Sequence, residues 1–220
     1  MRIISLDRAR PLPALKEAAA VIKAGGLVVF PTESFYAIGA DALNAEAVLK
    51  VFLAKGRTAQ KPLPVIIHDK ALIPRYVKDL SPIAAKAVEL LTPGPITLIF
   101  WASSAFPGEL TGGTGRVGIR VPAHEAASGL ARLSDGPVTA TSANISGTPG
   151  QTGALEAAAA LGGLVDLVLD AGSTPGPPPS TLLDLTVSPP ELIREGRLEI
   201  SALESALGAL KPRVTKPELS

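Results

Sequence analysis

Short apolar runs alternate with amphipathic stretches along the whole chain. Apolar residues recur at intervals of three and four over Pro13–Ala24, which predicts a helix, and Gly25 and Gly26 follow as its stop. The fully apolar run Leu27–Phe30 ends at Pro31 and predicts a short buried strand. Because strands and helices interleave in this way to residue 210, we expect an α/β fold: one domain with a twisted mixed or parallel sheet flanked by helices.

Capping residues mark where further helices begin and end. Asn44 precedes a helix that continues to Lys55 and stops at Gly56, and Ser81 and Pro82 open another helix. The helix that Ser81 and Pro82 open is expected over residues 83–91, and the remaining helices are expected over residues 124–133, 155–161 and 198–210. The remaining strands are expected over residues 63–67, 96–101, 117–121, 138–141, 165–169 and 181–187.

The Gly- and Pro-rich stretch 171–179 (AGSTPGPPP) has the composition of a linker. Only about forty residues follow it, however, and they contain a strand pattern that needs a sheet to join. We therefore expect a long loop inside one domain of residues 1–205, followed by a polar C-terminal tail over residues 206–220.

Bulk composition narrows the class of protein. Hydrophobic residues make up 46% of the chain and charged residues 19%, which is enough apolar material for a core. The net charge of +1 gives no global electrostatic basis for binding nucleic acid, and the absence of cysteine excludes disulfides and cysteine nucleophiles. No signal-peptide pattern opens the chain and no apolar run approaches the ~18 residues of a membrane span, so we expect a cytoplasmic protein without a membrane partner.

Several polar clusters follow a predicted strand directly, where open α/β sheets collect their ligands. They are residues 31–34 (PTES), Arg120, and residues 141–144 (TSAN); the group 55–57 (KGR) lies instead at a helix end. Lys55 has an alternative role as a cation that offsets the helix macrodipole, and TSAN is also common turn chemistry. The functional interpretation is an anion site in which cations and hydroxyl groups surround phosphate or carboxylate.

Other site classes lack support. The chain contains no GxxxxGK[ST] motif, no GxGxxG that opens a helix after a strand, and no GxSxG. His68 and His124 are isolated, so each is expected to be structural or at the surface, with no protein metal site. Aromatic residues make up only 4% of the chain, which argues against a stacking platform for single-stranded nucleic acid.

Seven separated stretches together resemble one family. They are PTESFYAIGADA (31–42), KGRTAQKPL (55–63), TPGPITLIF (92–100), VGIRVPAH (117–124), TATSANISG (139–147), STLLDLT (180–186) and LIREG (192–196). Their order and spacing are similar to those of the YrdC-like family of threonylcarbamoyl-AMP synthases, in its single-domain form. The resemblance covers residues 12 to 200, nearly the whole chain.

The resemblance implies a nucleotidyltransferase that makes threonylcarbamoyl-AMP and pyrophosphate from ATP, L-threonine and bicarbonate. The product serves the N6-threonylcarbamoyladenosine modification at position 37 of tRNA, so tRNA or proteins of that pathway are implied as partners. The implied fold is a twisted α/β sheet with a concave, positively charged face. Mg²⁺ is expected to arrive with ATP, since it bridges phosphates and keeps water ligands.

Site residues carry over position by position. The resemblance implies catalytic roles for Lys55 and Arg57. It implies ATP contacts for Arg57, Lys61, Ser142, Asn144 and Arg194. It implies threonine contacts for Ser34, Arg120 and Ser180. This set suits the reaction, because attack of a carbamate on a phosphate brings two anions together and cations stabilise that approach.

The sequence also departs from the family pattern. Ser34 stands where many members have threonine, Ile66 where histidine is frequent, and Gly150 where a serine is common; Arg116 and Ala140 replace hydroxyl residues. Residues 176–181 (GPPPST) also differ from the usual approach to the next strand. Two alternatives therefore stay open: a module of the same fold that binds double-stranded RNA or tRNA, and a paralogue that adenylates another small substrate.

Overall fold

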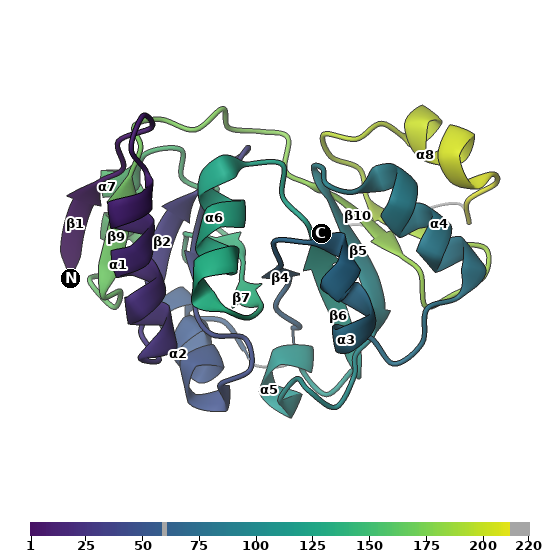
Figure 1. Cartoon of the computed structure of the whole chain (residues 1–220), viewed down its shortest axis with the longest axis horizontal. Coiled ribbons are helices and arrows are strands. Elements are labelled where there is room, and N and C mark those ends of the chain that lie inside the picture. The colour runs from purple at the N-terminus through teal and green to yellow at the C-terminus, as the bar shows by residue number, and fades with distance from the viewer. Residues whose placement is uncertain (59–60, 212–220) are drawn as a thin grey trace.

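The computed structural model describes residues 1–58 and 61–211, and it confirms the predicted α/β class (Figure 1). The strands are β1 (Arg2–Ser5), β2 (Val28–Pro31), β3 (Tyr36–Gly39), β4 (Val65–Ile66), β5 (Ile96–Trp101), β6 (Arg116–Arg120), β7 (Val138–Thr139), β8 (Thr141–Ser142), β9 (Leu167–Asp170), β10 (Thr181–Asp184) and β11 (Glu191–Arg194). The α-helices are α1 (Leu12–Lys23), α2 (Ala45–Lys55), α3 (Ile73–Tyr76), α4 (Pro82–Leu91), α5 (Gly108–Thr111), α6 (Glu125–Ser134), α7 (Ala154–Ala160) and α8 (Ile200–Leu207), and a 3₁₀ helix covers Lys70–Leu72.

The strands form two mixed sheets where the sequence predicted one. The first sheet has the order β1-β9-β2-β3-β8, and the second has the order β11-β10-β5-β6-β4-β7. In Figure 1 the first sheet lies on the left with α1 and α6 in front of it, and the second lies on the right with α3, α4 and α8. The domain thus consists of two layered halves side by side.

The predicted strand over residues 138–141 is the place where the two sheets meet. Thr139 pairs with Val65 of β4 in the second sheet, whereas Ser142 pairs with Ala37 of β3 in the first sheet. Between them, the N–H of Ala140 donates to the carbonyl of Pro64 at 2.8 Å. One extended segment therefore passes from the second sheet to the first at Ala140. Because the backbone stays extended through this change, the sequence pattern predicted one strand over residues 138–141 where the structure has two.

The two sheets are covered differently. In the first sheet, Phe30 packs with Leu15 and Ile22 of α1 and with Leu130 of α6, in one apolar cluster. In the second sheet, alternate side chains of β5, β6 and β10 enter the larger cluster, together with residues of α4 and α8. Because side chains of a strand alternate between faces, the other residues of β5, β6 and β10 point to the opposite face, which is left for a cavity.

The predicted helix caps are confirmed. The Asn44 side chain accepts a hydrogen bond from the N–H of Ala47 at 3.1 Å, and Gly56 ends α2 with a φ of 55°. Ser81 accepts from the N–H of Ala84 at 3.3 Å. His124 caps α6, which confirms a structural role for this histidine. Each cap satisfies a backbone group that the helix itself leaves unpaired.

The C-terminal boundary differs from the expected one. The predicted domain limit at residue 205 falls inside α8, and Leu207 at the end of that helix is buried in the core. Of the expected tail over residues 206–220, residues 212–220 lie outside the described part of the chain. Helix α8 therefore belongs to the packed domain as far as Leu207.

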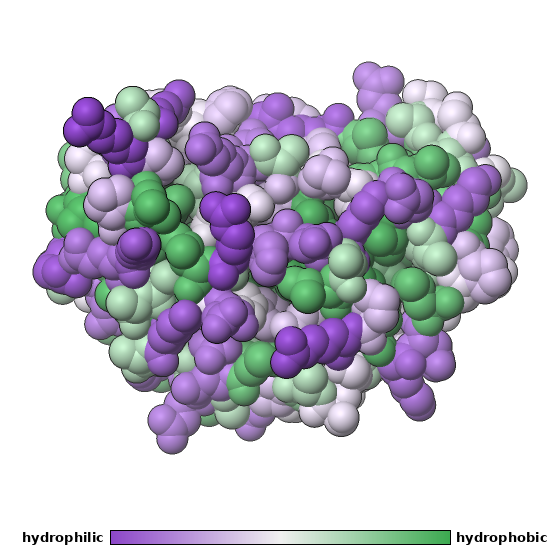
Figure 2. Space-filling model, in the orientation of Figure 1, coloured by the Kyte–Doolittle hydropathy of each residue, from purple (hydrophilic) through white to green (hydrophobic). Residues whose placement is uncertain are grey.

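The surface seen in Figure 2 mixes hydrophilic and hydrophobic residues over both halves. None of the helices in residues 1–58 and 61–211 combines the length and the apolar character that crossing a bilayer requires.

Candidate functional site

A cavity of about 890 Å³ lies on the uncovered face of the second sheet. Its floor consists of alternate residues of three neighbouring strands: Thr97, Ile99 and Trp101 of β5, Arg116, Gly118 and Arg120 of β6, and Leu182 and Asp184 of β10. The floor is low at its centre because Gly118 carries no side chain; a Cβ there would lie 2.9 Å from the methyl carbon of Thr97. The size and the mixed lining are those of a small-molecule site.

The walls of the cavity come from loops that leave the first sheet. One wall is the turn between β2 and β3, with Glu33 and Ser34, and another is the segment from Ala140 to Asn144. Ser180, directly before β10, closes the rim. Residues from both sheets therefore converge on one space, as expected where strands end and the chain changes sheets.

Lys55 holds one wall in place from behind. Its Nζ donates to the carbonyl oxygens of Ser142 and Asn144 at 2.5 and 2.9 Å, and to Oδ1 of Asn144 at 3.1 Å. The Ser142 hydroxyl also donates to Oδ1 of Asn144 at 2.5 Å, and Nδ2 of Asn144 donates to the carbonyl of Thr148. All three N–H groups of the ammonium are thus used by the turn, so Lys55 acts as a positioning residue for Ser142 and Asn144.

The burial of Lys55 perturbs its ionisation. Only 2% of this residue is exposed, and burial, with a smaller effect of the Arg57 charge, lowers the pKa of Lys55 to about 8. An unfolded lysine titrates near 10.4, so between these two values the unfolded chain binds more protons than the folded one. Stability must therefore rise with pH in that window.

This sign gives a measurable prediction. We expect the free energy of unfolding of the wild type to increase relative to that of Lys55→Met between pH 8 and pH 10.5, with a slope of at most about 1.4 kcal/mol per pH unit. Urea unfolding at four or five pH values measures it. A difference for Lys55→Met that is constant or falls with pH would contradict the assignment.

Arg57 and Arg194 supply positive charge to two sides of the cavity. Arg57 donates through Nη2 to the carbonyl of Pro62 at 3.0 Å, and its buried Nε has no partner among the described residues. Arg194 donates through Nε and Nη2 to the carbonyl of Ser180. Burial lowers the pKa of both guanidinium groups, but arginine stays charged at neutral pH.

Arg120 is the most deeply buried cation of the floor. It is 9% exposed, and its Nη2 forms an ion pair with the carboxylate of Glu33 across the cavity. Burial, with the charges of Arg197 and Arg194, lowers the pKa of Arg120 to about 10. Near it the hydroxyls of Ser180 and Thr97 lie 3.2 Å apart, within hydrogen-bond distance. A buried guanidinium beside hydroxyl groups suits a small carboxylate ligand.

The charge balance of the lining favours an anion. Among the described residues, four arginines (Arg57, Arg116, Arg120 and Arg194) and two carboxylates (Glu33 and Asp184) line the cavity. No group of three or more histidine, aspartate or glutamate side chains within residues 1–58 and 61–211 could hold a metal ion. The arrangement can bind phosphate and carboxylate groups and stabilise charge that develops between them.

A family model described as "Telomere recombination", for Sua5, YciO and YrdC proteins, matches residues 20–196. The chain belongs to the Sua5/YciO/YrdC family. A threonylcarbamoyl-AMP synthase of Pyrococcus abyssi is 39% identical over 90% of this chain and 58% of its own length. The threonylcarbamoyl-AMP synthase of Bacillus subtilis is 36% identical over 90% of this chain and 58% of its own length. The chain thus spans less than two thirds of these two relatives.

One further relative and two solved structures match over most of this chain. A putative threonylcarbamoyl-AMP synthase of Mycobacterium tuberculosis is 35% identical over 87% of this chain and 88% of its own length. A crystal structure of P. abyssi Sua5 complexed with L-threonine superposes with a TM-score of 0.92 at 38% identity, over 96% of this chain and 62% of that one. E. coli YciO shares the fold, with a TM-score of 0.81 at 24% identity over 91% of this chain and 97% of that one.

Most of the site residues predicted from the family motifs meet in the cavity. Its lining includes Ser34, Arg57, Arg120, Ser142, Asn144, Ser180 and Arg194. Lys55 lies behind the lining, and Lys61 is exposed and outside it. The roles assigned to these residues stay predictions, whereas the convergence of seven of them on one cavity is a property of the fold of this family member.

Several lining residues were not predicted as site residues, among them Glu33, Arg116 and Trp101. Glu33 was seen only as part of its motif, although it pairs with Arg120. Arg116 was noted as a departure from the family pattern, and Trp101 as the last residue of a strand. The alternation of β5 and β6 could have placed Trp101 and Arg116 on the same face as Arg120, because all three stand at even intervals from Ile99 or Gly118.

Proposed function

We propose that this chain is an L-threonylcarbamoyl-AMP synthase that uses ATP, bicarbonate and L-threonine. The observation that carries the proposal is the convergence of Arg57, Ser142 and Asn144 with Arg120 and Ser180 in one cationic cavity. The family membership supports the same activity, because the relatives named threonylcarbamoyl-AMP synthase match this chain over most of its length. The first group suits a polyphosphate and the second a small carboxylate.

The reaction needs positioning more than proton transfer. The amine nitrogen of threonine attacks the carbon of bicarbonate; a C–N bond forms, a C–O bond breaks, and the oxygen leaves as water with a proton of the amine. An oxygen of the resulting carbamate attacks the α-phosphorus of ATP; the bond to the bridging oxygen of the β-phosphate breaks, and pyrophosphate leaves. Arg57 and the Ser142–Asn144 turn orient the phosphates and neutralise charge as the two anions approach. Arg120 binds the carboxylate of threonine, which replaces the carboxylate of Glu33 as its ion-pair partner. Preorganised cations of this kind lower the barrier most effectively in a site that excludes water.

Mg²⁺ enters this proposal with ATP. Since the described residues offer no cluster of carboxylate or imidazole ligands, the ion would be held by phosphate oxygens and water rather than by a protein cage. When bound, it would supply further neutralisation of the leaving pyrophosphate. We propose a tRNA-modifying protein as the consumer of the product, since a carbamoyl-phosphate anhydride is reactive and suits transfer to an adenosine amine.

A single assay tests the activity. The folded protein is incubated with ATP, Mg²⁺, bicarbonate and L-threonine, and mass spectrometry follows threonylcarbamoyl-AMP, with each substrate omitted in turn. We expect product only in the complete mixture. Serine and glycine in place of threonine test the paralogue that adenylates another substrate. Salt-sensitive binding of duplex RNA without any adenylate would support the RNA-binding module and would refute the enzyme.

A further inference from the structure

One end of the cavity carries an aromatic and guanidinium stack. Trp101 is the only tryptophan of the chain, it is 42% exposed, and it lines the cavity. Its partner in the β5–β6 register is Arg116, whose Cζ lies over the indole ring at 5.0 Å from the centroid. The two side chains therefore form a cation–π contact in which Arg116 lies over Trp101, and both line the cavity.

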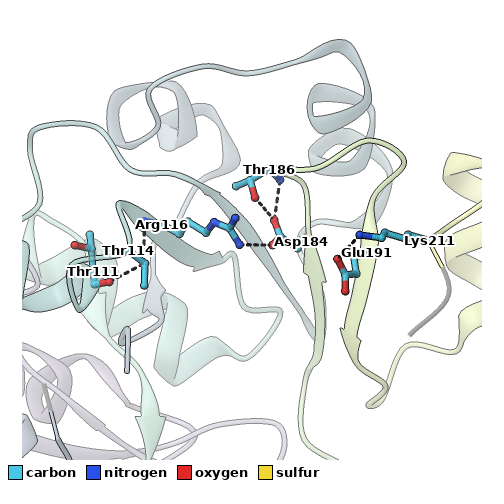
Figure 3. A network of polar contacts seen from close by, with 7 residues as sticks. All are labelled: Thr111, Thr114, Arg116, Asp184, Thr186, Glu191 and Lys211. Atoms are coloured by element: carbon cyan, nitrogen blue, oxygen red, sulfur yellow. Dashed lines mark hydrogen bonds and ion pairs between the residues drawn. The ribbon is translucent and has the colours of Figure 1, made fainter. Parts of the chain in front are cut away.

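An acidic residue fixes the orientation of this guanidinium. Nη1 of Arg116 donates to Oδ2 of Asp184 at 3.0 Å, as Figure 3 shows. The Asp184 side chain is only 4% exposed, and its Oδ1 accepts from the N–H and the hydroxyl of Thr186 at 2.8 and 2.6 Å. Because Asp184 is itself held at both oxygens, it restrains the plane of Arg116 while the guanidinium stays partly exposed.

Asp184 also changes what Arg116 can offer a ligand. The carboxylate offsets the positive charge of the guanidinium, so the attraction between Arg116 and a phosphate is weaker than that between Arg57 and a phosphate. Arg57 has no carboxylate partner among the described residues. What the pair keeps is a flat, polarisable surface. Planar groups of this kind stack on nucleobases.

The length of the floor agrees with a ligand that has different groups at its two ends. Arg120 and Arg116 both belong to β6, four residues apart, so about 13 Å of strand separates them. Gly118 and Ile99 lie between them and leave a low, apolar surface. A carboxylate at Arg120 and a base at Arg116 would place the phosphates between the two, within reach of the turn that contains Ser142.

We propose that the exposed face of the Arg116 guanidinium, backed by Trp101 and restrained by Asp184, stacks on the adenine base of ATP. This inference rests on the proposed function, since it takes ATP as the nucleotide. It assigns the base to the end of the floor opposite Arg120. It also gives Arg116, where the family pattern has a hydroxyl residue, a binding role of its own.

The single tryptophan reports on its own site. We expect saturating ATP to quench the fluorescence of Trp101, because a base stacked on Arg116 changes the surroundings of the indole. Inorganic tripolyphosphate, which has the phosphates without the base, should bind and leave the emission unchanged. Quenching by tripolyphosphate equal to that by ATP would overturn the inference, as would an unchanged emission when ATP is bound.

The second test replaces Arg116 by lysine, which keeps the positive charge and removes the planar guanidinium group. For Arg116→Lys we expect the Kd of ATP to rise at least fivefold, the lower end of what stacking on one base contributes, and the Kd of tripolyphosphate to change less than twofold. Arg75→Lys is the matched control, because Arg75 also lies over an aromatic ring, that of Tyr76, outside the cavity. Trp101→Leu should also raise the Kd of ATP, as Arg116→Lys does. Isothermal titration of variants with unchanged melting temperatures measures all four proteins.

The outcomes separate this inference from the proposed function. Equal losses for ATP and tripolyphosphate would make Arg116 a phosphate contact and overturn the stacking. Unchanged ATP binding in Arg116→Lys would overturn it as well, while the assay of product formation still supports the enzyme. Quenching of Trp101 by a single-stranded RNA oligonucleotide but not by ATP would assign the surface to RNA instead. If the wild type binds neither ATP nor tripolyphosphate, the proposed function and the inference fall together.

Discussion

Replacing Arg120 by methionine is expected to lower the free energy of unfolding by about 3–5 kcal/mol and to abolish measurable product formation. The first effect arises because Glu33 would keep a charge in the cavity wall without its partner. The second arises because the carboxylate of the substrate would lose its buried cation. Urea unfolding measures stability, and the mass-spectrometric assay measures activity at a threonine concentration that saturates the wild type.

The double variant Glu33→Gln/Arg120→Met separates the two effects. It removes both charges, so much of the lost stability should return, while product formation stays absent because nothing binds the threonine carboxylate. Glu33→Gln alone should lower the KM for threonine and change kcat less, because it releases Arg120 from its ion pair with Glu33. Recovery of activity in the double variant would refute the assignment of Arg120 to the substrate.

Arg57→Ala is expected to weaken ATP binding or turnover at least tenfold while the melting temperature stays nearly unchanged. Among the described residues, the side chain of Arg57 makes one hydrogen bond, to the carbonyl of Pro62, so we expect little of the fold to depend on it and its other N–H groups to bind phosphate oxygens. Titration with ATP and thermal unfolding measure the two quantities. Arg132→Ala, an exposed arginine of α6 outside the cavity, is the control and should change neither. Wild-type turnover in Arg57→Ala would contradict the ATP assignment.

Local chemistry was sufficient to predict the longer helices, whereas the four-residue helices α3 and α5 and the 3₁₀ helix were not predicted. Asn44, Ser81 and Gly56 mark helix ends through side chains or backbone angles that act within three or four residues, and the structure confirms each of them. The apolar spacing of α1 is equally local, and its observed bounds differ from the prediction by one residue at each end. Such features depend on neighbours in sequence, so no tertiary information was needed.

The strands were harder because their partners are distant in the chain. β1, β3 and β11 were not predicted: each has four residues, and each exists because a neighbouring strand pairs with it. The division of residues 138–142 between two sheets depends on β4 and β3, which no local pattern in that segment reveals. Short strands carry too few alternating positions to specify their sheet.

The site shows the same division between local and distant information. The family motifs predicted which residues gather at the cavity, but they did not separate Lys55, which supports the wall, from Arg57, which lines it. That distinction depends on a contact between residues 87 positions apart in the chain. The contact of Arg116 with Trp101 likewise needs the β5–β6 register, and the aromatic content of 4%, which argued against a stacking platform for single-stranded nucleic acid, gave no sign of it.

The crossing of the chain at Ala140 has a consequence for how the protein unfolds. The amide protons of Thr139, Ala140 and Ala143 are held by the carbonyls of Ala40, Pro64 and Tyr36, so the segment is bonded to both sheets within five residues. Neither sheet can open fully without releasing some of these amides. Hydrogen exchange of the three should therefore follow global unfolding rather than local fraying, and we expect the two halves to unfold as one cooperative unit.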